Sequence, residues 1–252
     1  MHLTWSWATL IVASFAAGVQ NALAGGGSFL TFPALLFTGI DPRTANIAST
    51  IALFPGQVTT GLAGRAHMAG AEGLSLRALC WISLFGGALG AVLLLVTPVS
   101  VFTRLVPFLV LFATVVFAWG SFFRKPSGNG DKASLDRRAA MLVQLCIAIY
   151  GGYFGGGIGI LMLAALTAAG LGVRQAGATK NVLAAIMNAS AVVIFLIQAR
   201  MLPWLQIVCV AVPAIAGGQL GAHLLHRVNE NALRIAVVCI GVALTVGLFV
   251  TS

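Results

Sequence analysis

The chain has 252 residues, of which 60% are hydrophobic and only 8% are charged, and its mean hydropathy is +1.03. A soluble domain carries charge on about a quarter of its residues because its surface faces water, so this composition excludes an ordinary soluble protein. The formal net charge of +9 could attract nucleic acid. However, the basic residues flank apolar segments or gather in one connection, which is their usual place in membrane proteins.

Eight apolar segments are long enough to cross a bilayer. A membrane helix needs about 20 mainly apolar residues to span about 30 Å of hydrocarbon. In chain order the expected spans cover residues 5–24, 45–64, 74–96, 101–122, 139–158, 178–199, 203–225 and 231–250. The sequence therefore predicts an all-α, polytopic integral membrane protein with about eight transmembrane helices.

A long polar connection, residues 123–138, separates the fourth segment from the fifth. It holds five of the fourteen basic residues around Pro126–Gly130, a composition typical of a flexible linker. We therefore expect a first membrane repeat at 1–122, a basic flexible linker at 123–138 and a second membrane repeat at 139–252. Because short basic loops stay in the cytoplasm, the linker is expected on the cytoplasmic side of the cell inner membrane.

The two halves share an internal repeat. Gly25–Gly27 recurs 130 positions later as Gly155–Gly157, and Gly86–Ala91 returns as Gly217–Ala222. Matches that keep their order across four segments predict two four-segment repeats. Transporters often use such repeats and bind substrate between them. The sequence leaves open whether these repeats are parallel or inverted.

The first segment is too long for one straight helix. Residues 5–38 are nearly all apolar, and a helix of that length would run about 51 Å. We therefore expect the first helix of each repeat to be broken at its glycine triplet. A helix that restarts there would direct free N–H groups and partial positive charge at a bound anion. The alternative is close helix packing through small residues, which is the reading we favour for the Gly86 and Gly217 blocks.

Polar residues follow each break at equivalent places in the two repeats. The aligned pairs are Thr50 with Asn181, Ser49 with Lys180, and Gln57 with Asn188. Each of these side chains could instead make a hydrogen bond between helices. The expected substrate-binding residues are Gly25, Gly26, Gly27, Ser28, Asn46, Ser49, Thr50, Gly155, Gly156, Gly157, Lys180, Asn181 and Asn188.

Lys180 stands at the start of an apolar helix. A lysine at the bilayer centre costs about 3 kcal/mol, so a buried one usually has a partner or a function; the alternative is that it snorkels to the interface. The acidic residues lie in short loops (Asp41, Glu72, Glu230) or in the linker (Asp131, Asp136). An interior without carboxylates but with glycine N–H groups, hydroxyls, amides and one lysine favours an anion over a cation.

The glycine motifs and their flanking residues resemble the sulfite exporter TauE/SafE family. The matching motifs are Gly25–Leu35, Gly39–Ile40, Thr44–Thr50, Tyr153–Gly159 and Ala178–Asn181, and the likeness extends over essentially the whole chain. One departure is Ala164 where the first repeat has Pro33. The resemblance implies a secondary transporter for sulfite, a sulfonate, sulfoacetate or a related organic anion, with export as its direction.

Other functional classes fit less well. An intramembrane aspartyl protease needs two membrane aspartates and a serine type needs a serine–histidine pair in its helices, which this pattern does not offer; a non-transporting membrane scaffold or assembly subunit remains an alternative. The cysteines, Cys80, Cys146, Cys209 and Cys239, fall in apolar segments without metal-ligand spacing. No metal or organic cofactor is implied. The expected partners are a small anion and the lipid bilayer, with a homodimer left open and no nucleic acid.

Overall fold

The structure is a computed structural model that describes residues 2–23, 26–71, 73–119, 122, 136–198, 202–224 and 230–251. Most of the predicted linker lies outside these residues. The described chain is all-helical, with a short 3₁₀ turn, η1 (Arg65–His67), after the third helix. The α-helices are α1 (His2–Leu23), α2 (Ser28–Leu36), α3 (Pro42–Gly64), α4 (Leu76–Val96), α5 (Val99–Ala118), α6 (Arg137–Tyr153), α7 (Ile158–Ala168), α8 (Val173–Gln198), α9 (Trp204–Leu224) and α10 (Glu230–Thr251).

The predicted all-α fold is confirmed, and each expected span overlaps one of the long helices. Among the described residues, four segments are long and apolar enough to cross a membrane by length and composition: Leu76–Val96, Val99–Ala118, Gln175–Ile197 and Trp204–Gly221. The outward-facing side chains include large exposed hydrophobic residues such as Val12, Phe85, Ile197 and Val250. A surface of this kind is unfavourable in water but suited to lipid.

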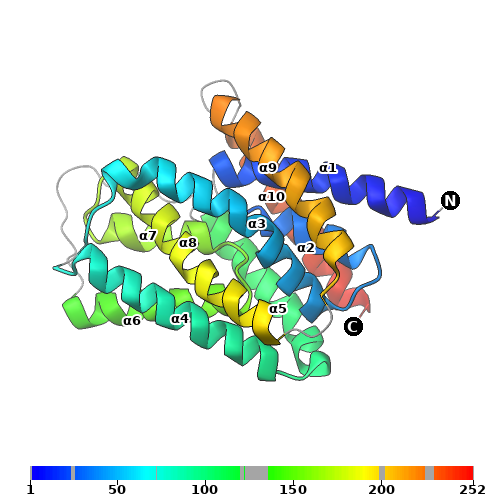
Figure 1. Ribbon diagram of the computed structural model, residues 1–252, viewed down its shortest axis with the longest axis horizontal. Helices are drawn as coiled ribbons and strands as arrows, with labels where there is room; N and C mark the ends of the chain where they lie inside the picture. The colour runs from blue at the N-terminus through cyan, green and yellow to red at the C-terminus, as the bar shows by residue number, and fades with distance from the viewer. Residues whose placement is uncertain are drawn as a thin grey trace.

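The most extensive helix contacts join helices of the first half to helices of the second half. Helix α1 packs on α9, and its counterpart α6 packs on α4; α3 packs on α9, and its counterpart α8 packs on α4. The counterparts α3 and α8 also contact each other, as do α5 and α10. Figure 1 shows α1 with α9 on one side and α4 with α6 on the other, with α3 and α8 between them. Each half therefore packs largely against the other half.

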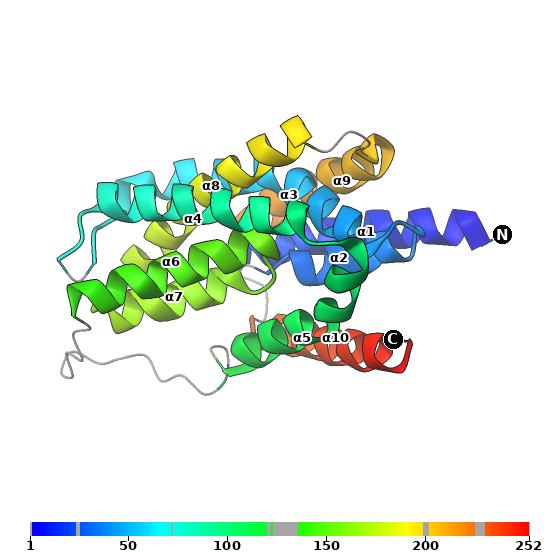
Figure 2. The ribbon, with the colours of Figure 1, turned by 90° about the horizontal axis from the view of Figure 1, so that it is seen from below.

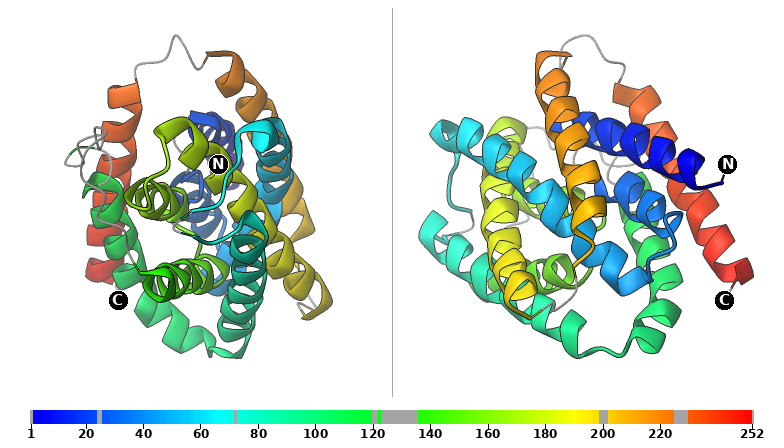
Figure 3. Two further views of the ribbon diagram at one scale, coloured as in Figure 1. Left: turned by 90° about the vertical axis from the view of Figure 1, so that its left-hand side faces the viewer. Right: turned by 45° about the vertical axis from the view of Figure 1, so that its right-hand side comes forward.

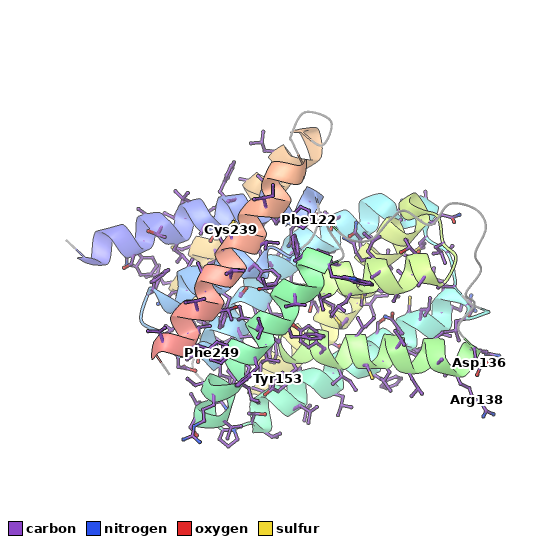
Figure 4. The ribbon with its side chains drawn as sticks, turned by 180° about the vertical axis from the view of Figure 1, so that it is seen from behind. Phe122, Asp136, Arg138, Tyr153, Cys239 and Phe249 are labelled. Atoms are coloured by element: carbon purple, nitrogen blue, oxygen red, sulfur yellow. The ribbon has the colours of Figure 1, made fainter. Side chains whose placement is uncertain are left out.

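Helices α5 and α10 form a pair on one flank of the bundle. Figures 2 and 3 show this pair beside the remaining helices, and Figure 4 shows Phe249 near the C-terminal end of α10, beside α5. The rings of Phe108 and Phe249 meet edge to face with their centroids 5.2 Å apart. Tyr153 at the end of α6 makes a similar contact with Phe102 of α5, at 5.7 Å. Aromatic contacts thus join the flanking pair and tie α5 to the break after α6.

The glycine blocks of α4 and α9 let backbones approach closely, which confirms their packing role. A Cβ atom at Gly90 would overlap the carbonyl oxygen of Ile149 on α6. At the equivalent Gly221 of α9, a Cβ would lie 3.0 Å from the Cα and carbonyl oxygen of Val19 on α1. Helices in lipid associate through such close contact. These glycines therefore allow α4 to pack closely on α6, and α9 on α1.

We expect Gly90→Ala to destabilise the protein, because the added methyl group must push α4 away from α6. Overpacking of this kind costs about 1–3 kcal/mol. The measurement is the thermal unfolding midpoint in detergent. The matched control is Gly177→Ala in α8, where a Cβ meets no atom within 4 Å and helix propensity favours alanine by up to about 1 kcal/mol. Equal midpoints for the two variants would contradict the packing role.

Candidate functional site

The first glycine triplet lies between two helices. Helix α1 ends at Leu23 and α2 begins at Ser28; Gly25 lies outside the described residues. Gly26 has a φ of +87°, a conformation that side-chain-bearing residues rarely adopt. The backbone N–H of Gly27 donates to Asn21 Oδ1 at 3.0 Å. The side chain of Asn21 in α1 therefore holds the start of α2 in place.

The second triplet is built in a related way. Helix α6 ends at Tyr153 and α7 begins at Ile158, and Gly155 and Gly157 have φ values of +76° and +72°. The carbonyl group of Tyr153 accepts a hydrogen bond from Asn46 Nδ2 at 3.0 Å. An amide from the first half thus satisfies a carbonyl group that the end of α6 leaves without a helical partner.

Both breaks open onto one cavity of about 290 Å³. Gly26 and Ser28 line it from the first break, and Gly155, Ile158 and Gly159 line it from the second. Two helices therefore begin at the same cavity. The N-terminus of a helix carries about half a positive charge, and two of them favour an anion there.

The remaining walls come from four long helices and combine polar and apolar groups. Lys180 is the charged side chain of the lining as far as the described residues go. The polar lining residues are Asn21, Ser28, Gln57, Thr59, Thr60, Asn181 and Gln219, and the larger apolar ones are Leu53, Ile158 and Ile215. A cavity with one cation, several hydrogen-bond donors and apolar walls can hold a small anion with a modest apolar part.

The cavity brings together five of the predicted site residues, namely Gly26, Ser28, Gly155, Lys180 and Asn181. The others that the structure describes are not part of its lining: Gly27, Asn46, Ser49, Thr50, Gly156, Gly157 and Asn188.

These outer residues make contacts that support the lining. Ser49 Oγ lies 2.6 Å from Thr31 Oγ1, and the Thr50 hydroxyl donates to the Asn46 carbonyl within α3. Gly156 accepts a hydrogen bond from the Tyr150 hydroxyl at 3.0 Å. These residues therefore contribute to helix packing and to the hydrogen bonds around the breaks.

Several lining residues were not among the predicted ligands, including Asn21, Gln57, Thr59, Thr60 and Gln219. The sequence did point to Gln57 as a site residue, because it aligns with the predicted ligand Asn188. It also pointed to Gln219, because this residue interrupts an otherwise matching glycine block where the first repeat has Ala88. Among the described residues, no group of three His, Cys, Asp or Glu side chains could hold a metal ion.

The profile of the sulfite exporter TauE/SafE family matches residues 10–248. This chain belongs to that family. Family membership and the apolar helices together make it a multi-pass membrane protein. The predicted resemblance is confirmed over nearly the full length of the sequence.

Several bacterial relatives carry transporter names. The chain is 30% identical over 247 residues to a "Probable membrane transporter protein" of Haemophilus influenzae, covering 94% of this chain and 92% of that protein. It is 31% identical to "Probable membrane transporter protein ORF9" of a Sinorhizobium species, covering 96% and 91%. It is 24% identical to "Probable membrane transporter protein YfcA" of Escherichia coli K12, covering 96% and 89%. These names describe membrane transporters. No solved structure matches the chain at a significant level.

We expect Gly56→Leu to weaken substrate binding while the protein still folds. Gly56 of α3 lines the cavity, and a Cβ at this position meets no atom within 4 Å. The leucine side chain would therefore occupy space needed by the ligand. Packing a ligand against the added methylene groups costs about 1–3 kcal/mol, which is a loss of affinity of roughly 5- to 150-fold.

The control for this variant is Gly177→Leu, at an equally open helical position that does not line the cavity. Binding is measured by calorimetry in detergent and folding by the unfolding midpoint. Wild-type affinity in Gly56→Leu would show that the ligand binds elsewhere.

Proposed function

We propose that this chain is a secondary transporter that exports a small anion, such as sulfite, a sulfonate, sulfoacetate or a related organic anion, across the cell inner membrane. The observation that carries this proposal is the meeting of two helix N-termini and Lys180 in one cavity. Among the described residues of its lining there is no carboxylate. Partial charges from two helices and one full charge from lysine together favour an anionic ligand.

The proposed architecture has eight spans in two four-segment repeats, residues 1–122 and 139–252, joined by a cytoplasmic linker at 123–138. The exchange of helix contacts between the halves supports two equivalent units. The breaks of both units line the same cavity, which agrees with transporters that bind substrate where two repeats meet. Rocking of one unit against the other would then expose the cavity to each side of the membrane in turn.

Within the cavity, Lys180 supplies the counter-charge and its neighbours supply donors. The two helix N-termini supply only partial charges, about half a unit each. A lysine within about 4 Å contributes about 4 kcal/mol at an effective dielectric of 20 before desolvation costs. The hydroxyl of Ser28 and the amide of Asn181 line the same space and can donate to anion oxygens. The two breaks would bring further backbone N–H groups to the anion.

The test of this function is anion flux through the purified protein in liposomes. We expect protein-dependent, saturable movement of labelled sulfite, and a thermal-shift panel of sulfite, thiosulfate, taurine, sulfoacetate and acetate to rank the substrates. Protein-free liposomes are the control. Absence of flux and of any thermal shift across the panel would favour a membrane scaffold instead.

We expect Lys180→Met to weaken anion affinity about tenfold or more while it leaves the unfolding midpoint nearly unchanged, because it keeps the stem and removes the charge. Lys180→Arg should restore affinity only in part, since a planar fork replaces a compact ammonium group. Arg77→Met is the control, because Arg77 is exposed at the start of α4 and does not line the cavity. Equal calorimetric affinities for wild type and Lys180→Met would mean that the lysine does not act as the counter-charge of the bound anion.

A further inference from the structure

Two amide side chains meet where α3 and α8 pack against each other. Asn188 Nδ2 of α8 donates to Gln57 Oε1 of α3 at 2.5 Å. These residues are equivalents in the two repeats, 131 positions apart. Their hydrogen bond therefore joins α3 of the first half to α8 of the second half. Their environments nevertheless differ, since Gln57 lines the cavity and Asn188 is buried behind it with 4% of its surface exposed.

The direction of this hydrogen bond decides which atom of Gln57 is available to a ligand. A primary amide has one oxygen that accepts and one NH₂ group that donates. Because Asn188 engages the oxygen, the NH₂ group of Gln57 is left as the polar end available to the cavity. A donor is the group that an anion requires, whereas the oxygen would repel it.

Asn188 makes this contact at a cost to folding. Its Oδ1 atom is buried and has no hydrogen-bond partner within the described structure. A buried acceptor without a partner lowers stability, and such groups in folded proteins call for an explanation. A leucine of similar outline would avoid the cost. Orientation of Gln57 is an explanation that the contact itself supplies.

We propose that Gln57 is a substrate-binding residue and that Asn188 is its positioning residue. Asn188 holds Gln57 Oε1, so that Gln57 Nε2 donates to the anion bound in the cavity with Lys180. This proposal rests on the proposed anion-transport function and adds to it a neutral donor contributed by the first half of the chain. The competing explanation is a structural pin, by which we mean that the Asn188–Gln57 hydrogen bond only stabilises the packing of α3 on α8 and does not affect the ligand.

The experiment is a double-mutant cycle read by calorimetric affinity for sulfite in detergent, alongside the unfolding midpoint. Gln57→Met removes the donor but keeps the stem, and should weaken sulfite binding about 10- to 100-fold, as expected for a hydrogen bond to a charged group. Asn188→Leu should weaken binding about 3- to 10-fold, because Gln57 is then free to turn its oxygen to the anion. In the Gln57→Met background, Asn188→Leu should have less than about a twofold further effect.

A structural pin predicts a different pattern. Asn188→Leu would then lower the unfolding midpoint and leave affinity unchanged, whereas the positioning role predicts an unchanged or higher midpoint. Gln144→Met is the matched control. Gln144 Nε2 of α6 donates to the buried Ser83 hydroxyl at a distance of 2.9 Å, and neither residue lines the cavity. This variant should lower stability without changing affinity. Asn188→Ala replaces Asn188→Leu if the leucine variant does not fold.

The outcomes separate this proposal from the function on which it rests. Wild-type affinity in Gln57→Met, with binding still lost in Lys180→Met, would overturn the role of Gln57 alone. Additive effects of Gln57→Met and Asn188→Leu would overturn the positioning role. No binding of sulfite or of any other anion in the panel to the wild-type protein would overturn the proposed function together with this inference.

Discussion

The bilayer cannot form hydrogen bonds with the backbone, and the rest of this structure depends on that constraint. A helix broken inside hydrocarbon leaves N–H and C=O groups that must find partners within the protein. Both breaks in this chain are supported in this way, by Asn21 at Gly27 and by Asn46 at Tyr153. The space between the supported breaks is the cavity. Polar chemistry is therefore concentrated where the two interrupted helices meet.

The two halves of the chain contribute different groups to that cavity. The second half supplies Lys180 where the first has Ser49, which turns away to Thr31. The first half supplies Gln57 where the second has Asn188, which stays behind the lining. Repeats can keep their fold while single positions diverge, because helix packing depends on small residues at the contacts and not on the cavity side chains. The two sides of the cavity therefore present different polar groups to a ligand.

The sequence predicted the long helices well, because apolar length alone marks a membrane segment. It placed the end of the fifth segment at residue 158, whereas α6 ends at Tyr153, since the positive φ values of Gly155 and Gly157 do not fit a helix. The site was harder to predict. Aligning the repeats shows which positions correspond but not which face of a helix they occupy. For that reason Asn46 was expected as a ligand, although its amide is used to complete α6.

The contact of α1 with α9 and of α4 with α6 has a consequence for biogenesis. Helices α1 and α4 of the first half find their main partners, α9 and α6, in the second half. A chain synthesised from its N-terminus must leave the α4 face uncovered until α6 arrives, and the α1 face uncovered until α9 arrives. Assembly is thus completed only when most of the protein has left the ribosome. Truncation between α6 and α9 would leave α1 without the neighbour that its surface requires, although α4 would keep its contact with α6.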